Sequence, residues 1–408
     1  MTFQLIAGVL WATVLLWLAG LVLTLRGIAR KRVLDPNAFA PPPETLAPLV
    51  SILVPARNEE HRVLSECLRS MLAQDYPSLE VVAVNDRSTD RTGVIMRALA
   101  ENDSRLRVID GAEPPAGWLG KPYALAQGLA SARGEWILAT DADMIYAPRA
   151  VSTSVAYAST GEYDALTLLP HVECFSFWER VFMPTFGWFM LLALPLERVN
   201  DPRRKEAIGV GGFFMIRRGA LEKIGGYAAV RGEVAEDLRM AEELKKSGAR
   251  LRLEYAPELV RTRMQPDLRN IWEGFTKNLF AGTKFSLWRT LLGSLGVLLF
   301  AVAPFFIALG VGILLLFSNG DGAAWRALFW PTLATWLLQV LIFALINKNS
   351  GVPVIYALAV PLGHALFTAI LLNSTFLIVT GRGVTWKGRK LYEREGDVRP
   401  PRGENQSG

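Results

Sequence analysis

The stretch that decides the fold reads WILATDADM and occupies residues 136–144. Its first four residues are apolar, which is typical of a parallel strand covered on both faces. Asp141 and Asp143 follow directly, at the place where open α/β sheets bind their ligands. Two carboxylates there could hold one Mg²⁺ together with the phosphates of a substrate. The same acidic triplet is also common in surface turns, so by itself it leaves both interpretations open.

Four apolar segments predict membrane helices on either side of a polar middle. Of the 408 residues 51% are hydrophobic, which is high for a soluble enzyme. Each segment reaches the length of about 20 residues that a membrane helix needs. Segments 3–25, 291–317 and 327–346 carry no charge, and segment 351–380 contains only His364 as an ionisable group. We therefore expect a transmembrane helix at residues 1–25 and a membrane region of about three spans at 291–381.

Charge places the middle of the chain in the cytoplasm. Arg26, Arg30, Lys31 and Arg32 follow the first apolar segment, which has no basic residue before it and is too long for a secretory signal. The positive-inside rule then predicts an outer N-terminus. The two cysteines fit a reducing compartment. The net charge of +6 is explained by basic residues at a lipid surface, so no nucleic-acid partner is expected. The prediction is a multi-pass protein of a bacterial-type inner membrane.

The C-terminal topology leaves two alternatives. Three spans after a cytoplasmic domain would put the tail outside, whereas basic residues after the last span favour the inside. Those residues are Arg382, Lys387, Arg389, Lys390 and Arg394. Either one apolar stretch is re-entrant, or a long one is broken into two passes at Pro304 or Pro361. We expect a cytoplasmic tail at residues 382–408.

The middle of the chain alternates apolar strands with helical patterns. After a basic, proline-rich linker at 26–47, with a stiff polyproline segment at 40–43, strands are expected at 50–54, 80–84, 106–109, 136–139 and 164–169. Strands alternating with helices predict right-handed βαβ units and a mostly parallel sheet. Glu59, Asp86 and Asp141 would then converge at one edge of it. Asp86 is also an ordinary turn former, and Asp90 a helix cap. No glycine-rich dinucleotide or P-loop motif follows the first strand.

Two later segments complete the polar middle. Residues 175–199 are strongly aromatic and contain Pro184, Gly187 and Pro195. We interpret them as a broken element at the membrane interface, with a core helix under the sheet as the alternative. Glu236 and Asp237 open a helix that runs to Lys246. Acids in a first helical turn are favoured by the helix dipole, and one of them could also serve as a general base if it faced a cleft.

Together these motifs resemble family 2 glycosyltransferases of the GT-A fold. The matching segments are VPARNE at 54–59, NDRSTD at 85–90, Gly120-Lys121, TDAD at 140–143, Gly211-Gly212 and Glu236-Asp237. The resemblance covers about residues 50–282 and the tail. It is closest to the membrane-anchored lipid glycosyltransferases, such as hopanoid-associated, carotenoid and ceramide glucosyltransferase-like enzymes. It implies a Rossmann-like GT-A catalytic domain at 48–260, followed by an interfacial helix region at 261–290.

The resemblance also implies roles for individual residues. Asp86 would bind the nucleobase, most often uracil, and Pro55 and Glu59 would line the nucleoside pocket. Lys121 would lie near the diphosphate. Asp143 would be the main ligand of a divalent cation (Mg²⁺ or Mn²⁺), and Asp141 would contact the ribose or the metal. Asp237 would deprotonate the acceptor hydroxyl, and a single displacement would invert the anomeric configuration.

The acceptor side departs from the pattern of processive polysaccharide synthases. Their Q-x-x-R-W motif is replaced by QPDLRNIW at 265–272, so Gln265, Arg269 and Trp272 stand at a different spacing. With Glu236 and Trp386 of the tail they are the candidate acceptor or interface residues. The helix expected at 270–282 would lie beside the acceptor entrance.

The sequence therefore predicts a glycosyltransferase that moves one sugar from a nucleotide sugar to a lipid hydroxyl. Its expected partners are the donor, the lipid acceptor and membrane lipids. The alternatives are a processive polysaccharide synthase and a catalytically silent membrane scaffold. Neither the sugar nor the lipid can be named from the residues.

Overall fold

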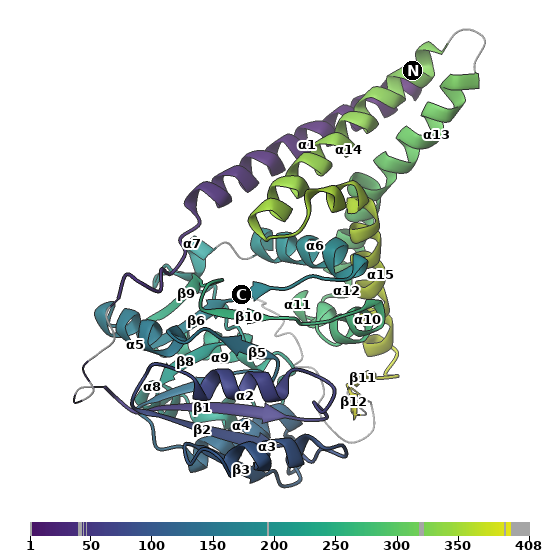
Figure 1. Cartoon of the computed structure of the whole chain (residues 1–408). Helices are drawn as coiled ribbons and strands as arrows, with labels where there is room; N and C mark the ends of the chain where they lie inside the picture. Colours follow the sequence, from purple (N-terminus) through teal and green to yellow (C-terminus); the bar gives the residue numbers. More distant parts are fainter. Residues whose placement is uncertain are drawn as a thin grey trace, which may run out of the picture.

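A computed structural model describes residues 2–39, 43, 45, 47–193, 196–317, 322–386 and 389–392. An α/β domain lies at one end, and long apolar helices extend from it at the other (Figure 1). Residues 40–42 of the expected polyproline segment lie outside the described part, as do Pro195, Lys387 and Arg394.

The α/β domain is built on a seven-stranded sheet of order β3-β2-β1-β4-β8-β6-β9. All neighbouring pairs are parallel except the two made by β8, which is antiparallel to β4 and β6. The expected mostly parallel sheet is confirmed. Its strands are β1 (Val50–Ala56), β2 (Leu79–Asn85), β3 (Leu106–Asp110), β4 (Trp136–Ala139), β6 (Ala165–Leu169), β8 (Phe214–Arg217) and β9 (Leu251–Tyr255).

Helices cover both faces of this sheet, which explains why its central strands are apolar throughout. Ile52 and Val54 pack into one hydrophobic cluster and Leu53 into the other, so that successive side chains of β1 are all buried. The first face is covered by α2 (Leu64–Leu72), α3 (Thr92–Ala100) and α5 (Ala150–Thr160); the second is covered by α4 (Gly120–Ser131), α8 (Arg218–Lys223) and α9 (Glu236–Lys246).

A small second sheet follows the turn after β4. It has the order β5-β10-β7, with β5 (Met144–Tyr146), β7 (His171–Val172) and β10 (Val260–Thr262). Because β5 begins directly after Asp143, this sheet fixes the turn that carries both acids. The hydroxyl of Thr262 donates to the carbonyl of Asp143 at 3.2 Å.

Four helices are long and apolar enough to cross a membrane, at Gln4–Arg30, Leu287–Phe317, Ala323–Asn349 and Val354–Val379. They correspond to α1 (Thr2–Arg30), to the continuous run α12 (Leu287–Val297), η3 (Leu298–Val302) and α13 (Ala303–Phe317), to α14 (Ala323–Asn349), and to η4 (Val354–Ala359) with α15 (Val360–Val379). Pro304 does not break its segment, because one π-helical turn precedes it. Pro361 lies in the first turn of α15, where proline is tolerated.

Two expectations about the membrane-proximal segments need correction. The aromatic segment is less broken than expected, since α6 (Phe177–Ala193) runs through Pro184 and Gly187, and α7 (Leu196–Val199) follows. Phe182 of α6 packs with Phe275 and Ile370, so α6 belongs to a helical layer above the sheet and not to the core beneath it. The helix expected at 270–282 is two helices, α10 (Leu268–Thr276) and α11 (Leu279–Gly282). Asp267 caps α10 by accepting from the Asn270 amide.

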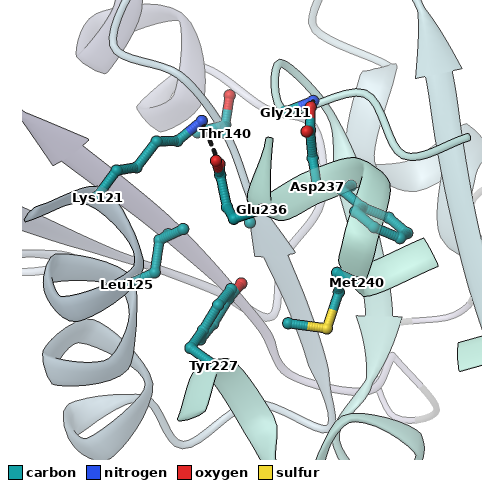
Figure 2. A pocket seen from close by; sticks show the side chains of 10 residues that line it. Lys121, Leu125, Thr140, Gly211, Tyr227, Glu236, Asp237 and Met240 are labelled. Atoms are coloured by element: carbon teal, nitrogen blue, oxygen red, sulfur yellow. Dashed lines mark hydrogen bonds and ion pairs between the residues drawn. The ribbon is translucent and has the colours of Figure 1, made fainter. Parts of the chain in front are cut away.

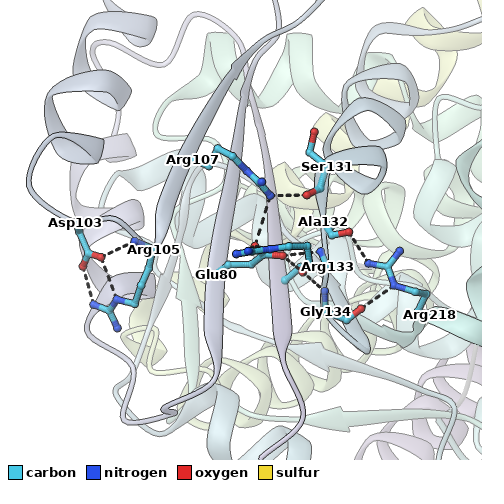
Figure 3. Close-up of polar contacts among 10 residues, drawn as sticks. Glu80, Asp103, Arg105, Arg107, Ser131, Ala132, Arg133, Gly134 and Arg218 are labelled. Atoms are coloured by element: carbon cyan, nitrogen blue, oxygen red, sulfur yellow. Dashed lines mark hydrogen bonds and ion pairs between the residues drawn. The ribbon is translucent and has the colours of Figure 1, made fainter.

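The buried carboxylate of Glu80 links neighbouring segments near the amino ends of β1 and β2 (Figure 3). Glu80 of β2 accepts hydrogen bonds from the Ser51 hydroxyl at 2.6 Å and from the Arg133 amide at 2.7 Å. The Arg133 guanidinium also contacts it at 2.8 Å. Burial raises the pKa of Glu80, but these hydrogen bonds outweigh the burial and hold the pKa below the ordinary value of a glutamate.

We expect Glu80→Gln to lower the free energy of unfolding by about 1–3 kcal/mol, because it weakens a buried, charge-assisted network. Since the pKa of Glu80 is lower in the folded state, this stabilisation is complete above the unfolded pKa of about 4.3 and is lost as the pH falls through the folded value. Thermal unfolding of detergent-solubilised protein from pH 7 to pH 3 tests this. Glu135→Gln, which removes an exposed partner of Arg217, is the control. A stability difference from wild type that does not shrink in acid would contradict the prediction.

Candidate active site

The sheet order brings the predicted donor residues to one edge. Pro55 lies near the end of β1, Asp86 follows β2, and Asp141 follows β4. These three strands are adjacent and parallel in the order β2-β1-β4, so their carboxyl ends meet. The convergence expected from the sequence is therefore present in the fold.

Lys121 lies at the centre of an acidic cluster at this edge (Figure 2). It comes from the first turn of α4, and its ammonium contacts Asp141 Oδ1 at 2.7 Å and Glu236 Oε1 at 2.6 Å. Glu236 is buried, whereas Asp141 keeps 40% of its side chain exposed. The ammonium thus joins the turn after β4 to the start of α9.

Gly211 packs closely against this cluster. Its amide donates to Asp237 Oδ2 at 2.7 Å. A Cβ at this glycine would lie 3.0 Å from Lys121 Nζ, 3.1 Å from Asp237 Oδ2 and 3.3 Å from Asp141 Oδ2. Asp141, Lys121 and Asp237 therefore surround one small residue, and a side chain there would press on all three.

The charges of the cluster stabilise one another. Desolvation lowers the pKa of Lys121, but the carboxylates of Asp141, Glu236 and Asp237 outweigh it and raise the pKa well above the ordinary value of a lysine. Burial raises the pKa of Glu236, and the adjacent ammonium opposes that shift. Lys121 is therefore a fixed positive charge at any physiological pH.

Asp143 faces a second cation that the sequence did not single out. Arg62 Nη1 lies 3.6 Å from Asp143 Oδ2, and Arg62 Nε lies 4.0 Å from Glu59 Oε2. Arg62 is held by the carbonyl of Met264, which accepts from it at 2.7 Å. No local sequence pattern indicates Arg62, because its position depends on Met264, about 200 positions further along the chain.

The donor set around the two aspartates fits a cation that is shared with a substrate. Within the described residues no group of three or more His, Cys, Asp or Glu could hold a metal ion. Asp141 and Asp143 supply two carboxylates, and Mg²⁺ is commonly held by one or two carboxylates plus substrate phosphates. The residues therefore fit an ion that binds together with a diphosphate.

The loops after β1 and β2 are hydrogen-bonded to each other beside Asp86. The Asn58 amide donates to the Ser88 hydroxyl at 3.2 Å, and the Thr89 amide donates to Asn58 Oδ1 at 2.9 Å. Asn58 and Arg87 have positive φ angles of 52° and 53°. Such a backbone is uncommon for arginine. Arg87 is held in place by ion pairs with Asp86 at 3.0 Å and with Glu113.

One cavity of about 1700 Å³ connects this edge of the sheet to the membrane helices. It is lined by all but two of the residues predicted from the sequence, namely Pro55, Glu59, Asp86, Lys121, Asp141, Asp143, Glu236, Asp237, Gln265 and Trp386. Its other walls include Leu23 of α1 and Trp188 and Leu191 of α6. The ammonium of Lys277, which also lines the cavity, lies 4.3 Å from the centre of the Trp386 ring.

Two predicted acceptor residues lie elsewhere, on the outer side of α10. Arg269 pairs with Glu273 at 3.1 Å and keeps 86% of its side chain exposed. Trp272 is 36% exposed, whereas Ile271 and Phe275 of the same helix are buried. The structure therefore does not bring Arg269 and Trp272 to the cluster.

Comparison with known proteins shows what part of this chain is similar to. Residues 51–225 match glycosyl transferase family 2. The "Probable glycosyltransferase YdaM" of Bacillus subtilis (strain 168) is 29% identical over 242 residues, which are 55% of this chain and 53% of that protein. The 4,4'-diaponeurosporenoate glycosyltransferase of Staphylococcus aureus (strain USA300) is 26% identical over 237 residues, 57% of this chain and 61% of the relative. The matches thus span little more than half the length of these relatives.

A solved structure shares the fold over most of the chain. The mannosyltransferase PcManGT from Pyrobaculum calidifontis, in complex with GDP-Man and Mn²⁺, is similar with a TM-score of 0.50 and 20% identity, covering 90% of this chain and 98% of that one. At this identity the likeness concerns the fold alone. The fold and the sequence match agree with the resemblance stated above: residues 51–225 are similar to glycosyl transferase family 2, within a domain of the same fold.

Proposed function

We propose that this enzyme transfers one sugar from a nucleotide sugar, expected to be UDP-linked, to a hydroxyl group of a membrane lipid. The continuous cavity carries this proposal. Its inner wall holds the polar residues of the sheet edge, and its outer wall includes exposed apolar side chains of α1 and α6. A water-soluble donor and an insoluble acceptor could therefore meet beside Asp237. The relative from Staphylococcus aureus is named for a lipid-like carotenoid acceptor, which agrees with this class.

The donor would lie along the ends of β1, β2 and β4. Asp86 would accept hydrogen bonds from the nucleobase, with Pro55 and Glu59 beside the nucleoside. Lys121 would place its positive charge near the diphosphate. Asp141 and Asp143 would hold a divalent cation, which neutralises charge on the departing diphosphate.

Asp237 is the proposed general base. It lies at the first turn of α9, where the Gly211 amide fixes its Oδ2. Its carboxylate would take the proton of the acceptor hydroxyl. The acceptor oxygen then bonds to the anomeric carbon as the bond to the diphosphate oxygen breaks, and one displacement inverts that carbon. The nucleoside diphosphate leaves, and the proton stays on Asp237 until it passes to water.

The helix arrangement supports a tail on the same side as the catalytic domain. Val360, at the start of α15, packs with Ala301, midway along the Leu287–Phe317 helix. Ile378, at the other end of α15, packs with Phe280 and Val384 beside the start of that helix. We propose that α15 therefore reaches only part of the way across the membrane and that α1, the α12–α13 run and α14 cross it. Three crossings put the catalytic domain and the tail together, in the cytoplasm by the positive-inside rule.

Single cysteines test this topology in a variant that lacks Cys174, with the buried Cys67 retained. An impermeant maleimide applied to intact cells should label Ala324→Cys, at the start of α14. It should label Thr380→Cys only after the membrane is opened. Labelling of Thr380→Cys in intact cells would overturn the proposed arrangement.

Mass spectrometry of total lipids tests the function. Cells producing the wild-type enzyme should contain a lipid that is heavier by one sugar than its precursor, and cells producing Asp237→Asn should lack it. A ladder of sugar additions would support the processive synthase instead. If wild-type membranes supplied in turn with UDP-linked and GDP-linked sugars formed no product and released no nucleotide, the silent scaffold would be favoured.

A further inference from the structure

A group of cations borders the large cavity where α1 leaves the membrane region. Arg26, Arg30, Lys31 and Arg32 all line the cavity. From the sequence these residues indicate the orientation of the chain and attraction to a lipid surface in general. The structure adds that α1 continues to Arg30, so that part of this charge is carried on a helix beside the cavity.

A pair of stacked tryptophans fixes α6 against the end of α1 that carries these charges. Trp188 stacks on Trp17 with ring centres 5.3 Å apart, and its indole N–H donates to the Thr24 hydroxyl at 3.1 Å. Tryptophan is enriched at membrane–water interfaces. At 1.5 Å per residue, Arg26 and Arg30 lie about 3–9 Å beyond Thr24 along the helix axis. Both residues therefore lie just beyond the uncharged segment 3–25.

Most of these cations have no carboxylate partner. Arg30 pairs with Glu197 of α7 at 2.9 Å, but 65% of each side chain is exposed, so the pair is weak. Arg26, Lys31 and Arg32 form no ion pair with any residue that the structure describes. The Lys31 ammonium lies 4.8 Å from the centre of the Tyr255 ring. Burial lowers the pKa of Lys31, as expected for a cation that lacks a neighbouring anion.

These cations stand apart from the donor site. Tyr255 is the last residue of β9, at the edge of the sheet, whereas Asp141 follows β4. Between β4 and β9 there are three strand spacings, which correspond to about 14 Å. A diphosphate held by Asp141 and Lys121 would not neutralise Lys31.

Beside the cations the cavity wall is apolar. Leu23 of α1 is 53% exposed, and Leu191 and Leu192 of α6 are 42% and 40% exposed. All three line the same cavity. The apolar wall could contact an acyl chain, and the cations without a carboxylate partner could contact a phosphate. A phospholipid carries both groups in one molecule.

We propose that this mouth of the cavity, between the end of α1 and α6–α7, binds an anionic phospholipid of the membrane. Arg26, Lys31 and Arg32 contact its phosphate, and an acyl chain lies against Leu23 and Leu191. The phosphate site lies apart from the donor residues, whereas the apolar wall is shared with the path proposed above for the acceptor lipid. Its occupancy makes the enzyme sensitive to the anionic lipid content of its bilayer.

Native mass spectrometry of the delipidated, detergent-purified protein tests this site without any donor sugar. The probes are phosphatidylglycerol and phosphatidylcholine with the same acyl chains. We expect the wild type to retain phosphatidylglycerol preferentially. Lys31→Ala combined with Arg32→Ala should weaken that binding by about 10–30-fold, because each basic residue near the surface contributes to lipid attraction.

A matched control removes two other basic residues. Lys348→Ala with Arg382→Ala makes the same change in charge at residues that do not line the cavity, and it should leave binding unchanged. Lys31→Arg combined with Arg32→Lys keeps both charges and should bind phosphatidylglycerol like the wild type. Weak binding by the alanine variant would then be due to the lost charge and not to misfolding. Equal phosphatidylglycerol binding by the wild type and the double alanine variant would overturn the proposal. Displacement of the lipid by millimolar inorganic phosphate would also overturn it, in favour of a free-anion site.

Discussion

Replacing Asp237 with asparagine is expected to lower kcat by about 10²–10⁴-fold, the range found for general acid–base groups. Asparagine has nearly the same size as aspartate. Its side-chain oxygen can still accept the hydrogen bond that the Gly211 amide donates to Asp237 Oδ2 at 2.7 Å in the wild type. It cannot take a proton from the acceptor hydroxyl. The fold and donor affinity should therefore survive while turnover falls.

The measurement is release of nucleoside diphosphate with and without acceptor, in protein reconstituted into vesicles. Glu243→Gln is the control, because Glu243 lies on the same helix and pairs with Arg239 and Lys246 on its outer side. Its kcat should stay within twofold of wild type. A wild-type rate for Asp237→Asn would show that another group accepts the proton. An unchanged KM for the donor would separate loss of the base from loss of donor binding.

The sheet could be predicted largely because its strands are short apolar runs that end in turn residues. The expected strand at 80–84 is part of β2, and Glu236 and Asp237 open α9 as expected. The position of β8 could not be predicted. It inserts antiparallel between β4 and β6, and strand order depends on contacts between segments distant in the sequence.

Helix ends near the membrane were predicted less well, for physical reasons. The apolar segment that predicted the first helix ends before the first charged residue. Arginine is a good helix former, so α1 continues to Arg30. Pro184 suggested a break, yet α6 is continuous through it. The packing of Phe182 against Phe275 and Ile370 supports the helix there, and no local sequence signal contains those contacts.

Most of the residues predicted for the site line one cavity, but Arg269 and Trp272 do not, and the contacts among the others could not be predicted. The sequence placed Asp141 and Lys121 in one nucleotide site, but not the ion pairs of Lys121 with both Asp141 and Glu236. Nor did it indicate Arg62 beside Asp143. Both arrangements arise from side chains on separate elements, which sequence spacing cannot relate.

Replacing Asp143 with alanine is expected to lower kcat by about 10²–10³-fold, comparable to the loss of one preorganised electrostatic group. The reason lies in how the two acids are partnered. The Lys121 ammonium contacts Asp141 Oδ1 at 2.7 Å and would compete with a cation for that carboxylate. We therefore expect Asp143 to be the main ligand. Arg62 would be left without this partner in the variant.

The test measures both activity and metal binding. Wild-type activity should disappear in EDTA and return with Mn²⁺ or Mg²⁺, and the electron paramagnetic resonance signal of Mn²⁺ should change when UDP is added. Asp143→Ala should lose that change. Asp103→Ala, which removes the carboxylate that pairs with Arg105 in the turn before β3, should keep both responses. Full activity of the wild type in EDTA would contradict the metal assignment. A wild-type Mn²⁺ signal in Asp143→Ala would move the ligand role to Asp141, and Lys121 would then have to leave that carboxylate before the donor could bind.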